Sequence, residues 1–397
     1  MDIPDRETKT QKTSGGLGIL LFFVLLIIVM STAAIAYLNA KGIDIKKVSL
    51  KEVFENRFFI GTKDKYDIES NEIIFNSSQW QEFVICKDYI VRCTNTGVEY
   101  FDKGGEQKQV FPVNLNNPFV KCQGEYLLIA EPETKKIYVF NGTEKIWEDK
   151  LEYNIINADI NSSGYTAIVH RSDRGKTAVS VYNRTGEFLF TKIKGTTFII
   201  SAKVSPNGKS VLVNSVDYSG TNIDTGLELY TITGDNIAGK KIENMMIASL
   251  WFLDSNTIAA MGDSQILLLD KSLDARWESP VTGTIMSSGV MNGKYAVFAF
   301  AEKKGTAAFG DNLPKVLILD GGGREISDYT LNQDVVSIAT GGELIAINTG
   351  KSVYFIDTTG RLRGSFVCEK EIKGVSFFGN REALVITKDS IIILKMG

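Results

Sequence analysis

Histidine is nearly absent from this chain of 397 residues and cysteine is rare: His170 is the single histidine, beside four cysteines. No Cys-x-x-Cys pair occurs, so the ligand spacing of a zinc site is missing and we expect no metal. A strong charge of either sign is also missing, because 44 Lys and Arg are balanced by 47 Asp and Glu. Phosphate binding needs clustered basic residues, so nucleic acid is not an expected partner.

Charged residues are missing from residues 13–40, and residues 17–38 (LGILLFFVLLIIVMSTAAIAYL) are almost wholly apolar. At about 1.5 Å per residue, a helix over this segment is about 33 Å long, which matches a hydrocarbon core of roughly 30 Å. We therefore predict an uncleaved transmembrane signal anchor at 17–38. A cleaved signal peptide is the alternative, because Ala34-Ile35-Ala36 has the small-x-small form of a cleavage site.

The predicted anchor implies a single-pass protein of the cell membrane. A long domain after a first span is translocated largely regardless of flanking charge, so we expect residues 1–16 as a cytoplasmic tail and residues 66–397 as an extracytoplasmic domain. Residues 39–65 form the expected linker. Within it, Ser49 and Glu52 fit a capping box that predicts a short helix. We interpret this segment as a stalk, with a partner-binding helix as the alternative.

Sustained helical periodicity is missing after the anchor, and a short repeat takes its place. A β-rich run ends in an apolar residue, usually followed by Asp or Asn and a Gly-containing turn. Successive copies begin 37 to 50 residues apart, at Val98, Ile137, Val179, Leu227, Ile266, Val316, Val353 and Ile391. This spacing is typical of four-stranded propeller blades, so the sequence predicts an all-β, eight-bladed β-propeller, with seven blades as the alternative.

Apolar hairpins precede these copies, as in VSPNGKSVLV from Val204, and we interpret them as the first two strands of each blade. The last blade has only three strands before the chain ends. Residues 66–76 read as a strand without a hairpin partner. We therefore predict that this N-terminal strand pairs beside Ile391–Met396 and closes the ring.

The repeats resemble those of quinoprotein-like propellers at two places: Asp270 is followed by Trp277, and a looser echo ends near Trp147. In quinoproteins such a Trp staples adjacent blades, but only two of the eight repeats carry it, so no cofactor is implied. VSPNGKSVLV is similar to hairpins of WD-like and TolB-like propellers. The whole chain resembles a bacterial group of single-span membrane proteins with propeller ectodomains, a resemblance that implies no activity.

Several residues could indicate a catalytic or binding site, but each also has a simpler structural interpretation. We expect Cys86 and Cys122, at equivalent positions of adjacent blades, to be apolar core residues, with a Cys86–Cys93 disulfide as the alternative. His170 precedes a charged turn without a Gly-x-Ser-x-Gly elbow, so we expect a surface or hydrogen-bonded side chain. The Asp320–Gly323 stretch is followed by β-rich sequence, which indicates a turn and not a phosphate loop.

Two insertions, Asp217–Gly226 and Ala301–Pro314, lengthen two blades, and long loops on a rigid frame are where binding residues collect. We therefore predict a binding, scaffold or sensor module without catalytic activity, whose protein or cell-envelope partner contacts one face of the propeller. The candidate partner-binding residues are Tyr218, Asn222, Asp224, Lys303, Lys304, Phe309 and Asp311. The alternative is a propeller enzyme, either quinone-dependent or a hydrolase or lyase that uses channel-lining carboxylates.

Overall fold

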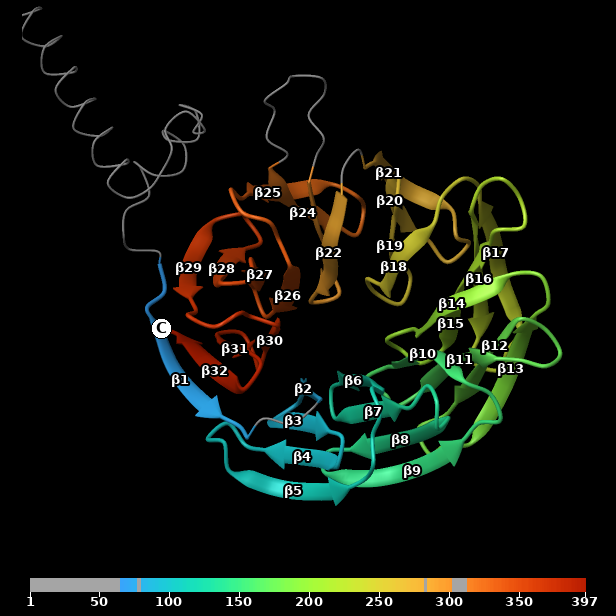
Figure 1. The fold of residues 1–397 in the computed structure, drawn as a ribbon. Helices are drawn as coiled ribbons and strands as arrows, with labels where there is room; N and C mark the ends of the chain where they lie inside the picture. Colours follow the sequence, from blue (N-terminus) through green and yellow to red (C-terminus); the bar gives the residue numbers. More distant parts are fainter. Residues whose placement is uncertain (1–64, 77–79, 282–283, 302–312) are drawn as a thin grey trace, which may run out of the picture. The chain divides into compact units, whose positions relative to one another are not determined.

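The computed structural model describes residues 65–76, 80–281, 284–301 and 313–397. Every regular element in these ranges is a strand, and the strands form eight antiparallel four-stranded sheets. Figure 1 shows the sheets arranged as blades around a common centre. The predicted eight-bladed propeller is thus confirmed, and the seven-bladed alternative is wrong. The predicted anchor at 17–38 and the linker helix lie outside the described residues.

The first four complete blades follow one another along the chain. Their strands are β2 (Gln81–Cys86), β3 (Tyr89–Thr94), β4 (Gly97–Phe101) and β5 (Gln107–Pro112); β6 (Phe119–Gln123), β7 (Tyr126–Ala130), β8 (Lys136–Asn141) and β9 (Glu144–Lys150); β10 (Ile155–Ile160), β11 (Thr166–Arg171), β12 (Thr177–Tyr182) and β13 (Phe188–Lys194); and β14 (Phe198–Val204), β15 (Ser210–Asp217), β16 (Asp224–Thr231) and β17 (Asn236–Ile242).

The remaining blades use β18 (Ile247–Phe252), β19 (Ile258–Gly262), β20 (Gln265–Leu269) and β21 (Ala275–Pro280); β22 (Thr284–Met291), β23 (Tyr295–Ala301), β24 (Pro314–Asp320) and β25 (Glu325–Thr330); β26 (Ser337–Gly341), β27 (Leu344–Asn348), β28 (Ser352–Asp357) and β29 (Leu362–Val367); and β30 (Gly374–Phe377), β31 (Glu382–Ile386), β32 (Ser390–Met396) and β1 (Ile68–Ile74). We number the blades one to eight in this order. Each repeat copy predicted from the sequence lies on the third strand of its blade.

The ring is closed by strand exchange between the two ends of the described chain. β1 pairs antiparallel with β32 from Ile68 opposite Met396 to Ile74 opposite Ser390. The earliest described strand is therefore the outer strand of the last blade, as the unpaired strand in the sequence predicted. The backbone N–H of Tyr66 also donates to the carbonyl of Arg363 in blade seven (2.7 Å), which ties the incoming chain to its other neighbour.

Four of the eight repeats carry an Asp that organises the turn between the third and fourth strands. Asp320 Oδ1 accepts hydrogen bonds from the backbone N–H groups of Gly322 and Arg324, both at 2.9 Å. Gly323 completes the turn with φ of 86°, a left-handed conformation that glycine adopts without steric cost. The predicted turn at Asp320–Gly323 is thus confirmed. Asp102, Asp270 and Asp357 cap their turns in the same way.

Aromatic side chains join each of several blades to the next through these turns. A Cβ added to Gly323 of blade six would lie 2.2 Å from Cγ of Trp277, on the outer strand of blade five. Trp147 packs in the same way against Gly186 of the following blade, where an added Cβ would lie 2.8 Å from its ring. The blade-stapling role that the quinoprotein resemblance implied for the two tryptophans therefore exists in this ring.

The first strand of each blade forms the inner edge of the ring and pairs with a neighbouring strand on one side only. Polar side chains form hydrogen bonds with backbone groups on its other side. Asn214 donates through Nδ2 to the carbonyl of Ile247 in the next blade (3.1 Å), and Thr177 Oγ1 accepts from the N–H of Ile199 (2.8 Å). A buried backbone group without a partner costs about 1–3 kcal/mol, so each contact removes a penalty while joining two blades. The inner edge is therefore held by side chains from the preceding blade.

The cysteine prediction was wrong. Cys86 at the end of β2 and Cys122 in β6 form a disulfide, with their Cα atoms 5.6 Å apart, and thus link the inner strands of the first two blades. The Cys86–Cys93 alternative fails because Cys86 lies opposite Tyr89 at the hairpin turn, whereas Cys93 lies opposite Glu82, four residues further along the strand. Cys93 and Cys368 are free and buried.

Candidate functional site

The propeller has two unlike faces, because successive strands in a blade run in opposite directions. Connections from second to third strands, and links between blades, emerge on one face, which we call the loop face. The opposite face, the terminal face, carries the other turns. β1 begins at Ile68 beside Met396, the end of a third strand, so the chain enters the ring on the terminal face. The loop face therefore lies on the far side from the point of entry.

The first predicted insertion is shorter as a loop than the sequence suggested. β15 and β16 continue their pairing up to Asp217 opposite Asp224, so only residues 218–223 form the loop. Tyr218 is 54% exposed at its start, and Asn222 is also exposed. The other four candidates belong to the second insertion and lie outside the described residues: Lys303, Lys304, Phe309 and Asp311.

Asp224 has a structural role beside this loop. Its carboxylate pairs with Lys241 (2.8 Å) and accepts the backbone N–H of Asn244 (2.9 Å). The hydrogen bond from Lys241 is the main cause that lowers the pKa of Asp224, so the side chain stays charged. Asp224 thus holds the base of the loop, and Tyr218 is exposed at the start of the loop.

Tyr218 belongs to a cluster that the sequence did not reveal. Its ring stacks on that of Phe198, with centroids 5.2 Å apart. The ammonium of Lys176 lies 4.8 Å from the Phe198 centroid and 5.1 Å from that of Tyr218, and the guanidinium of Arg171 lies 5.8 Å from Phe198. We call these four residues the aromatic patch. They come from blades three and four, which follow one another in the chain, and the packing of these two blades brings them together.

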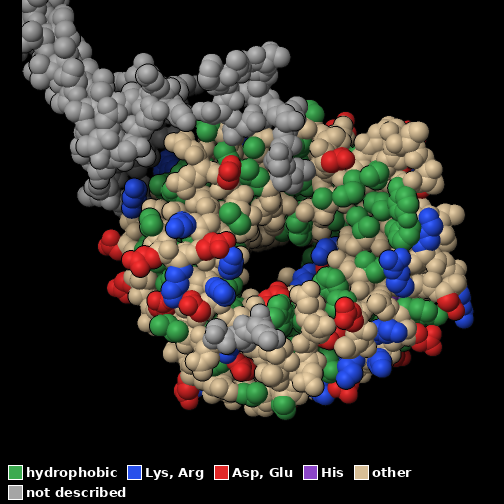
Figure 2. All heavy atoms as spheres, viewed as in Figure 1, with side chains coloured by type: hydrophobic (Ala, Val, Ile, Leu, Met, Phe, Trp, Pro, Cys, Tyr) green, Lys and Arg blue, Asp and Glu red, His purple; other side chains and the backbone are tan. Residues whose placement is uncertain are grey.

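Hydrophobic side chains surround the aromatic patch on the loop face. Figure 2 shows them gathered over β14–β17, at the right of the ring. Ile223 and Met246 are among the large apolar residues exposed here. Aromatic rings backed by cations, with apolar neighbours, make a surface that can bury area and also bind carboxylates or π-systems.

His170 precedes Arg171 of the aromatic patch and is held by two hydrogen bonds. Its Nδ1 lies 2.6 Å from the carbonyl oxygen of Arg171, and its Nε2 lies 2.9 Å from Oγ of Ser180, which in turn contacts Thr191. A carbonyl can only accept, so Nδ1 carries the proton and Nε2 accepts from Ser180. Burial lowers the pKa of His170, which keeps the ring neutral. The residue is hydrogen-bonded, as expected, and fixes the backbone of Arg171.

A second polar cluster lies on the inner strands of blades two, three and four, next to the central opening that Figure 2 shows. Lys121 on β6 and Lys203 on β14 both contact Oδ1 of Asp159 on β10, Lys203 at 2.9 Å. Asp159 Oδ2 accepts the backbone N–H of Val204 (3.1 Å). Both carboxylate oxygens are occupied, so Asp159 is poorly placed to take a proton from a substrate.

Glu82 is a second carboxyl on the inner strands of the ring. Burial raises its pKa to about 7, so this side chain titrates near neutral pH. It lies on β2, the inner strand of blade one, opposite Cys93.

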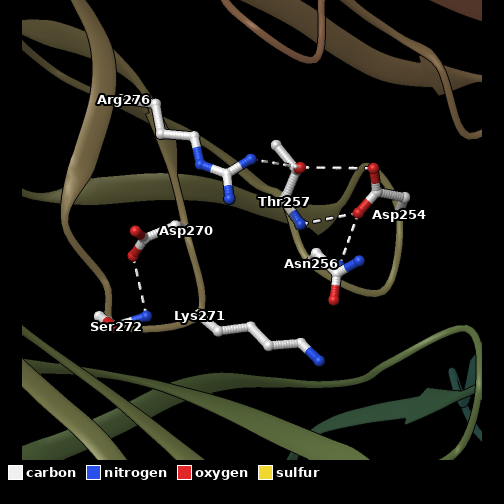
Figure 3. Close-up of a pocket in the computed structure, with 7 residues that line it drawn as sticks. All are labelled: Asp254, Asn256, Thr257, Asp270, Lys271, Ser272 and Arg276. Atoms are coloured by element: carbon white, nitrogen blue, oxygen red, sulfur yellow. Dashed lines mark hydrogen bonds between the residues drawn. The ribbon is translucent and has the colours of Figure 1, made fainter.

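A shallow depression on the terminal face of blade five is lined by polar side chains (Figure 3). Its two carboxylates already cap turns: Asp254 accepts from the N–H groups of Asn256 and Thr257, and Asp270 accepts from Ser272. Arg276 donates to Thr257 across it (3.4 Å). The depression is therefore explained by turn geometry.

In the part of the chain that the structure describes, no group of three or more His, Cys, Asp and Glu side chains is placed to hold a metal ion. The same residues contain no helix long and apolar enough to cross a membrane.

These features define an eight-bladed propeller with the aromatic patch on its loop face and a cluster of charged residues on its inner strands. The chain belongs to a family of unknown function (DUF5711), which it matches over residues 51–396. No curated protein sequence matches it. The family match covers nearly the whole propeller, and neither the family nor the fold identifies an activity.

Solved structures share the fold at low sequence identity. BamB from Moraxella catarrhalis is 9% identical with a TM-score of 0.52, covering 82% of this chain and 98% of its own. Dihydro-heme d1 dehydrogenase NirN, in complex with DHE, is 11% identical with a TM-score of 0.54, covering 80% and 73%. Identities this low show the propeller fold alone.

Proposed function

We propose that this protein is a membrane-anchored, extracytoplasmic binding module without catalytic activity, and that its loop face contacts a protein partner. One observation carries the proposal: the exposed Tyr218 ring is stacked on Phe198 and flanked by Lys176. Tyrosine and arginine are enriched among residues that dominate binding energy at protein interfaces. Here Arg171 ends β11 and Tyr218 directly follows β15, so the ring holds both positions and little order is lost when a partner binds.

The described chain enters the ring on the terminal face, where β1 begins beside Met396, whereas the aromatic patch lies on the loop face. The Cys86–Cys122 disulfide supports an address outside the cytoplasm, because disulfides persist in oxidising compartments and are rare in the cytosol.

Fractionation tests the proposed anchor. We expect the protein to sediment with membranes and to resist an alkaline wash, because a 22-residue apolar helix is not extracted by removing peripheral charge contacts. A variant lacking residues 1–60 should become soluble. A mature N-terminus near Tyr37 would instead show a cleaved signal and a released protein.

Removing the exposed aromatic ring tests the binding proposal. In Tyr218→Ala, combined with Lys176→Ser, we expect the partners captured by proximity labelling at the membrane to fall about tenfold or more, since a hot-spot residue contributes about 2 kcal/mol or more. Thermal stability should change little, because Tyr218 is half exposed. The labelled set of the wild type provides the reference.

Phe188 offers a matched control, because it is an equally exposed aromatic residue (55%) at the start of β13, by the turn on the terminal face. Phe188→Ala should leave the labelled partners unchanged. If the Tyr218 variant also keeps its full partner set, the loop-face proposal is wrong and attention moves to the terminal face.

A further inference from the structure

The cluster of Lys121, Asp159 and Lys203 on the channel wall carries more positive charge than the protein neutralises. Two ammonium groups share one carboxylate, which leaves a net charge of one. Each ammonium has three donors, and the described residues provide an acceptor for one on each lysine. The side chains of Lys121 and Lys203 are 30% and 24% exposed, whereas that of Asp159 is 3% exposed.

Two ammonium groups repel each other, so the contacts with Asp159 must hold Lys121 and Lys203 together. They converge on the same oxygen from blades two and four. Burial is the main cause that lowers the pKa of Lys121, and the neighbouring Lys203 charge adds to it, while Asp159 favours the charged form. An unbalanced charge in a partly buried site is costly unless a counter-charge is at hand. The concave wall also concentrates the field of the two lysines and attracts anions.

We infer that Lys121 and Lys203 form a binding site for a carboxylate group at the wall of the central channel. A second carboxylate opposite Asp159 accepts the free ammonium donors and makes the cluster neutral: two positive and two negative charges. A phosphate dianion would overshoot to a net negative charge, so the charge balance favours a monoanion. The group comes either from an acidic side chain of a bound polypeptide or from a small organic acid.

Two substitutions have opposite expected effects on anion binding. Asp159→Asn keeps the size and an acceptor oxygen but raises the net charge of the cluster from one to two, so carboxylate affinity should rise. Lys203→Met removes one positive charge and leaves a neutral Lys121–Asp159 pair, so affinity should fall. A merely structural ion cluster would give no such opposite pair of changes in binding.

The test measures thermal unfolding of the full-length protein in detergent, with sodium acetate titrated against sodium chloride at constant ionic strength. A ligand that binds only the folded state stabilises it by RT ln(1 + L/Kd), where L is the ligand concentration, so the unfolding midpoint rises with ligand concentration. We expect acetate to stabilise the wild type, to act at about tenfold lower concentration on Asp159→Asn, and to have no specific effect on Lys203→Met. Methyl acetate, which lacks the charge, should have no effect on any of them.

A blocked Gly-Asp-Gly peptide identifies the source of the carboxylate. Binding about tenfold tighter than acetate indicates a polypeptide ligand, and equal binding indicates a small acid; both outcomes support the site. Lys194→Met is a control for loss of a lysine in an ion pair elsewhere, since Lys194 pairs with Glu228 (2.5 Å). Equal effects of acetate and chloride on the wild type and on Asp159→Asn would overturn the inference, whatever the fate of the loop-face proposal.

Discussion

Deletion of residues 66–76 should leave the propeller strongly destabilised and prone to aggregation. This segment contains β1, whose seven residues pair with β32 and supply the outer strand of blade eight. Without it, β32 (SIIILKM) becomes an edge with unpaired backbone groups and apolar side chains. Ile68 would also be lost from the core it shares with blades seven and eight. We expect the loss to take up a large share of the about 5–15 kcal/mol that stabilises a folded protein.

The matched truncation removes residues 1–60 and leaves β1 in place. Residues 65–397 form a compact unit, so this shorter protein should unfold cooperatively in urea and stay monomeric in gel filtration. The 66–76 deletion should elute as aggregate or lose its cooperative transition. If the two truncations behave alike, closure by β1 does not contribute to the stability of the ring.

The sequence predicts the ring well because the repeat is local. The apolar third strand, the residue that begins the turn after it (Asp in four of the eight repeats) and the turn itself all lie within about ten residues, so the repeat recurs visibly along the chain. Closure is also predictable, since a blade short of one strand and a strand without a partner are both visible in the sequence. Trp277 and Gly323, one blade apart, show how the same local unit sets the contact between blades.

Contacts between blades beyond the repeat are harder to predict. The aromatic patch depends on the residue at which β14 begins, Phe198, and on the residue at which β15 ends, just before Tyr218. The pattern of strands in the sequence does not predict these bounds to the residue. Lys121, Asp159 and Lys203 read as ordinary alternating polar residues of three hairpins. Their convergence depends on the curvature of the ring, which the sequence shows only as a count of blades.

The disulfide illustrates the same limit. Cys86 and Cys122 have equivalent places in adjacent blades, which the sequence shows, but equivalence fits side-by-side packing and covalent bonding equally well. A shift of one residue between the hairpins decides it: Cys86 lies at the last pair of its hairpin, opposite Tyr89, and Cys122 one pair earlier, opposite Leu127. Two inner strands then bring the sulfur atoms together across the gap between blades.

Loss of this disulfide should be the second large effect on stability. The bond closes a loop with a sequence separation of 36, and the chain-entropy estimate lies between about 3 kcal/mol for 15 residues and about 4.7 kcal/mol for 100. We therefore expect the Cys86→Ala, Cys122→Ala double variant to lose about 3 to 4 kcal/mol of unfolding free energy in urea. Reductant should lower the stability of the wild type by a similar amount and leave the double variant unaffected.

Cys368→Ala is the matched control, because it removes a buried thiol that forms no disulfide. It should lose less stability than the double variant and should remain sensitive to reductant, since the Cys86–Cys122 link is intact. Thiol titration of the unfolded wild type gives an independent measure: two reactive thiols before reduction, from Cys93 and Cys368, and four afterwards. Four thiols before reduction, together with reductant-independent stability, would show that the two cysteines remain reduced and would remove the disulfide as support for an extracytoplasmic address. Two thiols, together with the expected loss of stability, would instead show that the disulfide stabilises the contact between the first two blades. This stabilisation would add to that from β1, which closes the ring by pairing with β32 in the last blade.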